Sequence, residues 1–309
     1  MAKKIIHFIG FVANADKSVS KIQLKHGFTF QVLSWDEASQ LLSKLETSLW
    51  DAIRRLCMDL PCCSLDGKYF VCIVNTFEDD VEFTDKGGLA KLPGELCKFQ
   101  KELVTNYLTK TWRALRLFKE GNVGLPVSYY YIADGMNKVL MGNLNSRFYR
   151  SRSAYTLDDA ELLSLMRFLN EVEIPFQSDF LELGLENYEL SHDTDRPTLE
   201  FLSLMISLET LLNPGGGELI YRISRNAAVL LGKNENESKL IFDDIKLLYH
   251  KRSQIVHTGS IKVIDIEDVL RLREYVRRCI KRIHKLNLNK PELLDILNSS
   301  GFGCFCSDK

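Results

Sequence analysis

The sequence lacks the features that mark membrane proteins, zinc knuckles and the common nucleotide-binding loops. No apolar run reaches the roughly 18 residues that a membrane-spanning helix needs. No two of the eight cysteines have the CxxC spacing of a zinc site, and neither GxGxxG nor GxxxxGK occurs. These absences exclude the simplest assignments to membrane, zinc-knuckle, Rossmann and P-loop proteins, and they predict no cofactor and no bound metal.

We also expect no secretion signal in the first residues. The start, Met1-Ala2-Lys3-Lys4, has the positive charge of a signal peptide, but the apolar run Ile5–Ala13 is interrupted by His7 and Gly10. No convincing cleavage site follows, so we interpret this run as a strand. Several of the cysteines fall inside apolar patterns, which favours reduced core thiols over disulfides. We therefore expect a cytoplasmic protein with no membrane partner.

The composition is that of a globular protein, with 45% hydrophobic and 26% charged residues in 309 positions, enough for two domains. The net charge of -1 hides an asymmetry. Residues 156–200 contain twelve acidic and two basic residues, whereas residues 246–285 contain eleven Lys or Arg and four acidic residues. Two interpretations stay open: complementary solvated helix faces, or a basic region that attracts a polyanion.

The first half has a mixed pattern of strands and helices. Ser34, with Glu37 three residues later, has the pattern of a capping box that begins a long amphipathic helix, which Pro61 ends. A second long helix is predicted from about Pro93 to Lys119. Strands are predicted at Lys4–Ala13, Lys21–Leu33, Lys68–Thr76, Val127–Ala133 and Lys138–Met141, with a hairpin tip at Asp16-Lys17-Ser18.

The second half is helical. Thr156 is the predicted N-cap of its first helix, which Pro175 breaks. Further helices are predicted at Asp179–Leu190, Thr198–Leu212, Glu218–Leu231, Ser238–His257, Asp265–Leu288 and from Lys290. The predicted fold class is α+β: a mixed α/β domain at residues 1–150, a helical bundle at 151–300, and a flexible tail at 301–309.

Residues 145–153 join the two halves and alternate arginines with aromatics. Arg147, Arg150 and Arg152 surround Phe148 and Tyr149. Bases of a nucleic acid stack on such aromatics while arginines hold phosphates. A solvent-exposed linker between domains is the alternative explanation of the same stretch.

The stretch with the clearest chemistry is Tyr249–Gly259, where Arg252 precedes His257 by five residues. Arginine remains charged and binds phosphate through two donors. Histidine gives or takes a proton near neutral pH. Together they supply what metal-free cleavage of an RNA phosphodiester needs. The structural alternative is that Arg252 pairs with an acidic neighbour such as Glu209 and that His257 caps the helix.

Helical geometry separates the two members of this pair. Five residues turn an ideal helix by about 500°, which leaves Arg252 and His257 about 140° apart on its surface. One straight helix therefore does not aim both at one phosphate. Either the helix unwinds near Thr258-Gly259, or a second copy of the chain completes the site across a two-fold axis.

Three blocks in order give the pair a context: a leucine-rich helix with Glu209, a Tyr221-Arg222 helix that ends at glycine, and Tyr249-His250-Lys251-Arg252-Ser253-Gln254-Ile255-Val256-His257. This arrangement resembles the HEPN superfamily, closest to its ApeA-like branch of anti-phage nucleases, over roughly residues 155–297. The resemblance implies a helical bundle that forms a homodimer and cleaves RNA without a metal. Many members have Asn, Asp or His directly after the arginine, where this chain has Ser253.

The resemblance assigns catalysis to Arg252 and His257. Supporting roles fall to Glu209, which would orient Arg252, and to Ser253 and Tyr249. RNA-binding roles, each with a structural alternative, fall on Lys251, Arg222, Arg277, Arg278, Lys281 and Arg282. A solvated helix face explains the last four equally well.

The resemblance thus implies an endoribonuclease that acts as a toxic effector in bacterial defence against phage. Its first half would bind a phage-derived trigger or an inhibitory partner. The rival interpretation is a catalytically silent HEPN dimer that serves as an RNA- or nucleotide-binding module, a scaffold or a regulatory subunit.

Overall fold

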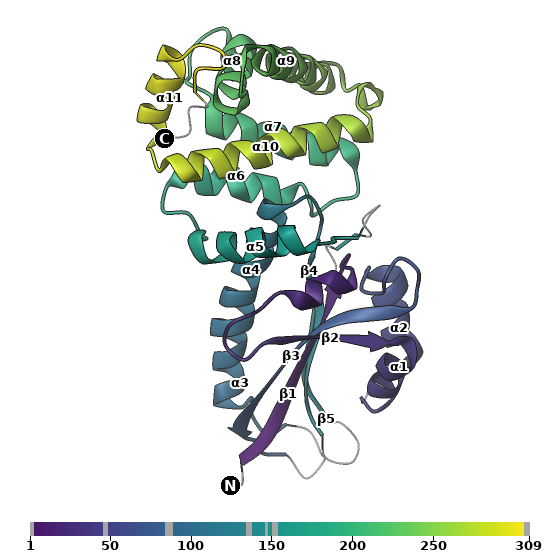
Figure 1. Ribbon diagram of the computed structural model, residues 1–309. Helices are drawn as coiled ribbons and strands as arrows, with labels where there is room; N and C mark the ends of the chain where they lie inside the picture. Colours follow the sequence, from purple (N-terminus) through teal and green to yellow (C-terminus); the bar gives the residue numbers. More distant parts are fainter. Residues whose placement is uncertain are drawn as a thin grey trace. The chain divides into compact units, whose positions relative to one another are not determined.

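The computed structural model describes residues 3–45, 49–83, 89–133, 138–145, 148–149 and 154–305. It is a mixed α/β structure that divides into two compact units, Met1–Ile174 and Pro175–Lys309. The first contains the sheet, and the second is helical (Figure 1). Within the described residues, no helix combines the length and apolarity that crossing a membrane needs.

The first unit is built on a five-stranded antiparallel sheet of order β2-β3-β1-β4-β5. Its strands are β1 (Lys3–Ala13), β2 (Thr29–Ser34), β3 (Tyr69–Asp80), β4 (Gly124–Ile132) and β5 (Lys138–Leu144). Its helices are α1 (Trp35–Ser43), α2 (Leu49–Arg54), α3 (Gly94–Phe99), α4 (Thr109–Phe118) and α5 (Asp159–Glu171).

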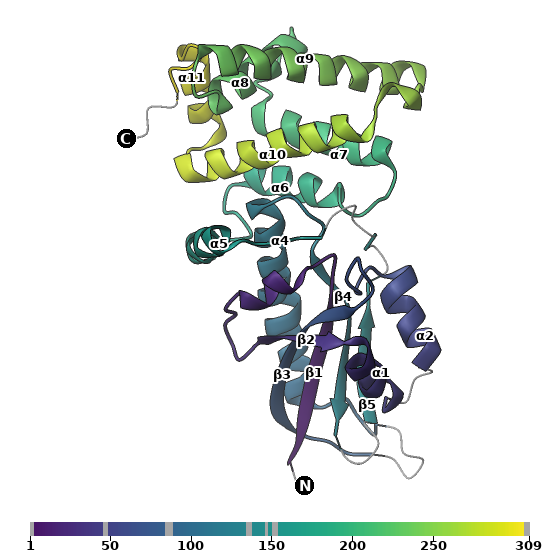
Figure 2. The same cartoon turned by 45° about the vertical axis from the view of Figure 1, so that its right-hand side comes forward.

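The central strand β1 is buried on both faces from Phe8 to Ala13, where its apolar residues do not alternate with polar ones. Ile6 and Phe8 pack with Leu96 and Trp112 of the α3–α4 layer. Ile9 and Phe11 lie in the core on the opposite face of the sheet, together with residues of α1 and α2. Figure 2 shows these two helical layers on opposite faces of the sheet.

Some sequence predictions for this unit are confirmed and others are wrong. The capping box at Ser34 and Glu37 is present. The predicted strand Lys21–Leu33 is wrong in its first part, because His26 and Gly27 have φ of 60° and 77° and turn the chain. The predicted hairpin tip at Asp16 is also wrong, since β3 lies between β2 and β1, and Asp16 instead caps a short 3-10 helix, Lys17–Lys21.

The two long helices predicted in this half are interrupted. The first divides into α1 and α2, and α2 continues as a π-helical turn at Arg55–Asp59. The second begins as α3, passes through π-helix at Gln100–Leu108 and ends as α4. Apolar periodicity places these segments correctly but does not indicate where the backbone changes its hydrogen-bonding pattern.

Helix α5 packs with the first unit, although the sequence placed it in the helical domain. Leu165 lies in the core that α4 covers, and the rings of Phe118 and Phe168 are 5.8 Å apart. The N-cap of α5 is Asp158, not Thr156, because Asp158 and Glu161 form the capping box. The division between the units follows Ile174.

Within residues 145–153, where arginines alternate with aromatic residues, the structure describes Phe148 and Tyr149. Phe148 is buried in the core, with the Arg116 guanidinium 5.4 Å from its ring, so it does not offer a face for base stacking. Tyr149 is 39% exposed. Arg147, Arg150 and Arg152 lie outside the described residues.

The second unit consists of α6 (Asp179–Leu190), α7 (Pro197–Leu212), α8 (Leu219–Leu231), α9 (Glu235–Thr258), α10 (Ile266–Leu286) and α11 (Lys290–Ser299), with a 3-10 turn at Ile261–Val263. Helices α6, α7 and α10 pack on one another, and α8 packs against α9 (Figures 1 and 2). Their bounds agree with the sequence prediction to within a few residues.

The start of the tail is packed rather than free. The Gly303 N–H donates to Ser238 Oγ at 3.1 Å, and the ring of Phe302 lies 6.0 Å from that of Phe242. A Cβ at Gly303 would come within 2.7 Å of the Asn234–Glu235 backbone, so the close approach requires glycine. The last four residues, 306–309, lie outside the described chain.

Candidate functional site

Helix α9 carries the predicted Arg252–His257 pair. It begins at the N-cap Asn234, whose side chain accepts from the Glu237 N–H, and has acidic residues in its first turn. It ends at Gly259, which has φ 68° and donates its N–H to the Ile255 carbonyl. The helix is therefore regular through His257 and does not unwind before it.

This regularity does not support the alternative in which the helix unwinds and brings Arg252 and His257 of one chain together. With both residues in one helix, Arg252 and His257 project about 140° apart. Arg252 is half-buried, whereas His257 is exposed in the last turn. A phosphate held by Arg252 therefore does not lie on the same side of the helix as His257 of the same chain.

Arg252 lies in a small cluster with Glu209 and Tyr249. Its Nε is 3.5 Å from Glu209 Oε1 at the end of α7, and its guanidinium lies 5.7 Å from the centre of the Tyr249 ring. The Tyr249 hydroxyl donates to the same Glu209 oxygen at 2.8 Å. The Arg252 side chain keeps 28% of its surface exposed, so the cluster orients the guanidinium and leaves part of it open to a ligand.

The Tyr249 hydroxyl is a fixed hydrogen-bond donor at neutral pH. Burial, followed by the nearby Glu209 carboxylate, raises the pKa of Tyr249 to about 12. Deprotonation would place a phenolate beside the Glu209 carboxylate, so the Tyr249 hydroxyl keeps its proton and donates it to that carboxylate. Tyr249 therefore positions Glu209 and is not a general base near neutral pH.

His257 and Ser253 stand apart from this cluster. The helix end is capped by Gly259 and by Thr258, whose hydroxyl donates to the Gln254 carbonyl at 2.6 Å. No hydrogen bond from the His257 side chain is found within the described residues, but His257 is the basic residue of the last turn, where a positive charge favours the helix dipole, so the alternative of a capping histidine stays open. Ser253 is half-buried, beside Arg252 in the chain.

Lys251 takes part in an ionic network between α9 and α10. Its Nζ donates to the buried carboxylate of Asp268 at 2.6 Å. Arg271 binds the other Asp268 oxygen at 2.7 Å and also reaches Asp244 at 2.7 Å. Burial raises the pKa of Asp268, but hydrogen bonds from Lys251, the Asp265 N–H and Arg271 outweigh it and lower that pKa overall. Lys251 therefore has a structural partner, which favours the structural explanation of this residue.

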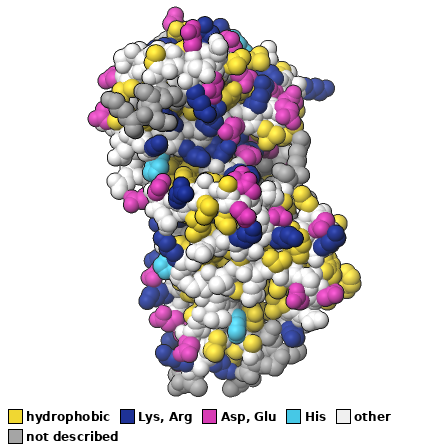
Figure 3. Space-filling model, in the orientation of Figure 1, with side chains coloured by type: hydrophobic (Ala, Val, Ile, Leu, Met, Phe, Trp, Pro, Cys, Tyr) yellow, Lys and Arg dark blue, Asp and Glu magenta, His cyan; other side chains and the backbone are white. Residues whose placement is uncertain are grey.

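The four cations predicted on α10 have contacts inside the second unit. Arg277 pairs with Glu274, and Arg278 reaches both the Leu231 carbonyl at 3.1 Å and Glu237 at 3.3 Å. Arg282 donates to the Phe305 carbonyl at 3.2 Å, and burial, followed by Arg277, lowers the pKa of Lys281. On the face drawn in Figure 3, Lys and Arg side chains of this unit lie among Asp and Glu side chains. These contacts favour a structural role over an open basic face.

Arg222 lies in a different setting from Arg252. Its Nη1 donates to the Gly215 carbonyl at 2.7 Å, and it lines a groove formed with the Asn213–Gly215 loop and α11. Within the described part of the chain, none of the Arg252 cluster lines this groove. The structure thus brings Arg252, Glu209 and Tyr249 together and places Arg222 elsewhere.

Two residues of these surfaces, Asp268 and Lys290, are not among the site residues that the sequence predicts. Asp268 is 1% exposed and joins α9 to α10. Its position three residues after the N-cap Asp265 is the signal that predicts a capping box. Lys290 lines the groove with Arg222, and its sequence neighbourhood carries no comparable signal.

Comparison with known proteins finds no match to this chain. No protein-family model, curated protein or solved structure matches the chain. The functional proposal therefore depends on the Arg252 cluster, the position of His257 and the order of the sequence blocks.

Proposed function

We propose that the chain is a metal-independent endoribonuclease of HEPN type that works as a homodimer. The observation that carries the proposal is the Arg252 cluster, in which Glu209 and Tyr249 hold a partly open guanidinium on a regular helix that also bears an exposed His257. An oriented, always-charged guanidinium is suited to a phosphodiester because it offers paired donors to two phosphoryl oxygens.

The chemistry assigned to these residues is transfer within the RNA backbone. The ribose 2′-oxygen attacks the neighbouring phosphorus and loses its proton to a base, while the 5′-oxygen leaves and gains a proton. His257 serves as the base or the acid, a role typically worth about 10²–10⁴-fold in rate. Arg252 stabilises the charge that grows on the phosphoryl oxygens. The products end in a 2′,3′-cyclic phosphate and a 5′-hydroxyl.

The dimer is part of this proposal because of where α9 aims the two side chains. A two-fold axis near the ends of two α9 helices would bring Arg252 of one copy towards His257 of the other. Val256, next to His257, is 51% exposed, and Ile261 just beyond the helix is 63% exposed. Apolar side chains exposed beside a site are suited to contact with a second copy.

We further propose that this activity is toxic to the host cell and serves bacterial defence against phage. Under that proposal the first unit binds a phage-derived trigger or an inhibitory partner and thereby controls the second. Expression of the wild-type chain should arrest growth, and His257→Ala should relieve the arrest.

One observation favours a second candidate, a catalytically silent HEPN dimer that binds RNA or a nucleotide. In a single copy Arg252 already has Glu209 as an ion-pair partner, and His257 projects elsewhere. A binding module would use Arg252 as an anion contact and would not need His257.

The test is incubation of the purified chain with RNA in EDTA, beside Arg252→Ala and His257→Ala. The proposal predicts cleavage by the wild type, 2′,3′-cyclic phosphate ends, and a loss of at least about 100-fold in either variant. Lys262→Ala, a change of an exposed cation near the same helix end, is the matched control and should cleave normally. Cleavage that persists in both variants contradicts the assigned site, and RNA binding without cleavage favours the silent module.

A further inference from the structure

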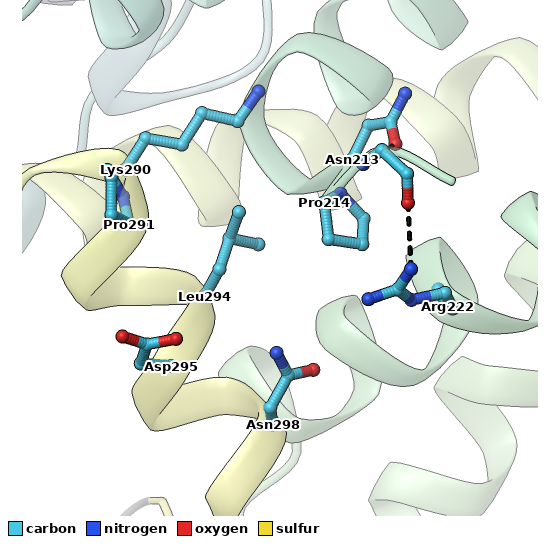
Figure 4. A pocket seen from close by; sticks show the side chains of 9 residues that line it. Asn213, Pro214, Arg222, Lys290, Pro291, Leu294, Asp295 and Asn298 are labelled. Carbon is cyan, nitrogen blue, oxygen red and sulfur yellow. Dashed lines mark hydrogen bonds between the residues drawn. The ribbon is translucent and has the colours of Figure 1, made fainter. Parts of the chain in front are cut away.

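A groove on the second unit lies between the loop that follows α7, the start of α8 and helix α11. Its volume is about 600 Å³, and its lining residues are Asn213, Pro214, Gly215, Arg222, Lys290, Pro291, Leu294, Asp295 and Asn298. Figure 4 shows Pro214 and Leu294 facing each other across it, with Arg222 on one side and α11 on the other. The volume falls in the range of small-molecule sites, about 300–1,000 Å³.

Arg222 presents unused donors to this groove. Its Nη1 is held by the Gly215 carbonyl at 2.7 Å, and the other terminal nitrogen points into the groove in Figure 4. Gly215 and Gly216 both have φ of 79°, the left-handed conformation in which glycine is favoured. The loop thus brings a carbonyl to the guanidinium and fixes its direction.

The charge of Arg222 has no carboxylate partner within the described residues, in contrast to Arg252, Arg271 and Arg273 of the same unit. Asp295 is the acidic residue of the groove's lining, on α11 across from Arg222, and no ion pair between the two is found within the described residues. A half-buried guanidinium held by one neutral oxygen keeps most of its capacity for an anion.

Lys290 adds a second positive charge at the opposite wall. Its Nζ donates to the Thr210 carbonyl at 2.8 Å, and no described carboxylate pairs with it. Burial lowers the pKa of Lys290, which is the cost of keeping a charged amine away from water. An anion in the groove would offset this cost.

We propose that the groove binds an organic phosphate ester, with its phosphate on Arg222 and the organic part against Pro214 and Leu294. Asn213 and Asn298 supply carboxamides that donate to phosphate oxygens or accept from hydroxyl and amino groups. The same chemistry is found in a free mononucleotide and in one or two nucleotides of an RNA strand. The proposal does not depend on the ribonuclease activity.

The experiment measures binding of three probes to the full chain by calorimetry: inorganic pyrophosphate, adenosine 5′-monophosphate and a 2′-O-methyl oligoadenylate. The methyl groups block the 2′-oxygen, so the oligomer is not cleaved by the proposed nuclease. Arg222→Gln should weaken binding about tenfold or more, the loss expected for one charge-assisted contact. Asp295→Asn should strengthen binding, because it removes a like charge from the rim.

Lys239→Gln is the matched control, since it removes an exposed cation of the same unit that pairs with Glu235 outside the groove, and it should bind as the wild type does. Asn298→Asp is a second test that keeps the Arg222 contact with Gly215 and should weaken binding by placing a negative charge in the groove. Thermal unfolding checks that each variant folds.

The source of the phosphate follows from the ranking of the probes. Tighter binding of the mononucleotide supports a small-molecule ligand, and tighter binding of the oligomer supports an RNA strand. The proposal is overturned if no probe binds, or if Arg222→Gln and Asn298→Asp both bind as the wild type does. Oligomer binding is measured on Arg252→Ala chains, which lack the phosphate contact of the proposed nuclease site, so failure of the ribonuclease proposal is distinguishable from failure of this one.

Discussion

At the scale of single residues, the Tyr249 hydroxyl sets the geometry around Arg252 and gives stability a dependence on pH. The pKa of Tyr249 is about 12 in the folded chain against an ordinary 10. The folded state therefore keeps its proton to higher pH than the unfolded state, and stability is lost as the pH rises from about 10 to about 12. Tyr249→Phe should lose less stability over that range than the wild type.

Urea unfolding of both proteins at about pH 8 and about pH 11 measures this difference. At the lower pH, Tyr249→Phe should be less stable by about 1.5 kcal/mol, the lower end of the range for one hydrogen bond to a charged group. Equal alkaline losses in the two proteins would contradict the hydroxyl's contact with Glu209.

Asp268 gives the opposite dependence at acid pH. Its pKa lies below the ordinary 3.8, so its contribution to stability is present above that value and is lost as the pH falls through the folded pKa. Asp268→Asn should destabilise the chain by about 2 kcal/mol near neutral pH, because it leaves Lys251 and Arg271 without their buried partner.

Asp243→Asn, at an exposed position of α9, is the control for Asp268→Asn and should change stability little. Urea titrations at about pH 7 and about pH 3 should show the Asp268→Asn deficit shrinking with acid. A deficit that stays constant would mean that the carboxylate charge does not carry the effect.

At the scale of elements, the end of α9 depends on Gly259. Its φ of 68° is the left-handed conformation, and an added Cβ would meet no atom within 4 Å. Gly259→Ala should therefore cost about 1 kcal/mol through backbone strain alone. Gly217→Ala, where φ is not left-handed and the space is also open, is the matched control and should be nearly neutral in thermal unfolding.

The sequence predicted elements well where local chemistry decides them. Ser34 with Glu37 forms the capping box that its spacing predicts, and the helix predicted from Asp265 has its N-cap at that residue. The apolar helices of the second unit have strong periodicity, so their bounds were close. The sequence also indicates a helix end that depends on a single glycine, such as the end of α9 at Gly259.

Features that depend on distant partners could not be predicted. The strand order β2-β3-β1-β4-β5 places β3 between β2 and β1, and local turn signals near Asp16 do not reveal this. The packing of α5 with the first unit depends on Phe118 and Phe168, which lie far apart in the sequence. The Arg252–Glu209 contact is predicted only because the family resemblance places an acidic residue at Glu209 and because the positive charge of Arg252 favours an acidic partner.

At the scale of the whole molecule, the two units should fold independently. The second unit has its own buried core, which includes Leu204, Leu208, Ile245, Val276 and Ile280. A fragment of residues 175–309 should therefore be helical by circular dichroism and should unfold cooperatively. A fragment without a cooperative transition would mean that the first unit supplies part of its core.

The central claim is that Arg252 of one copy works with His257 of another. The direct test is RNA cleavage in EDTA by a mixture of Arg252→Ala and His257→Ala chains, each inactive alone, after exchange of subunits. A mixed dimer has one site with both residues and one site with neither, so the mixture should recover up to about one quarter of wild-type activity. If the wild type cleaves and the mixture stays inactive, the shared site is contradicted.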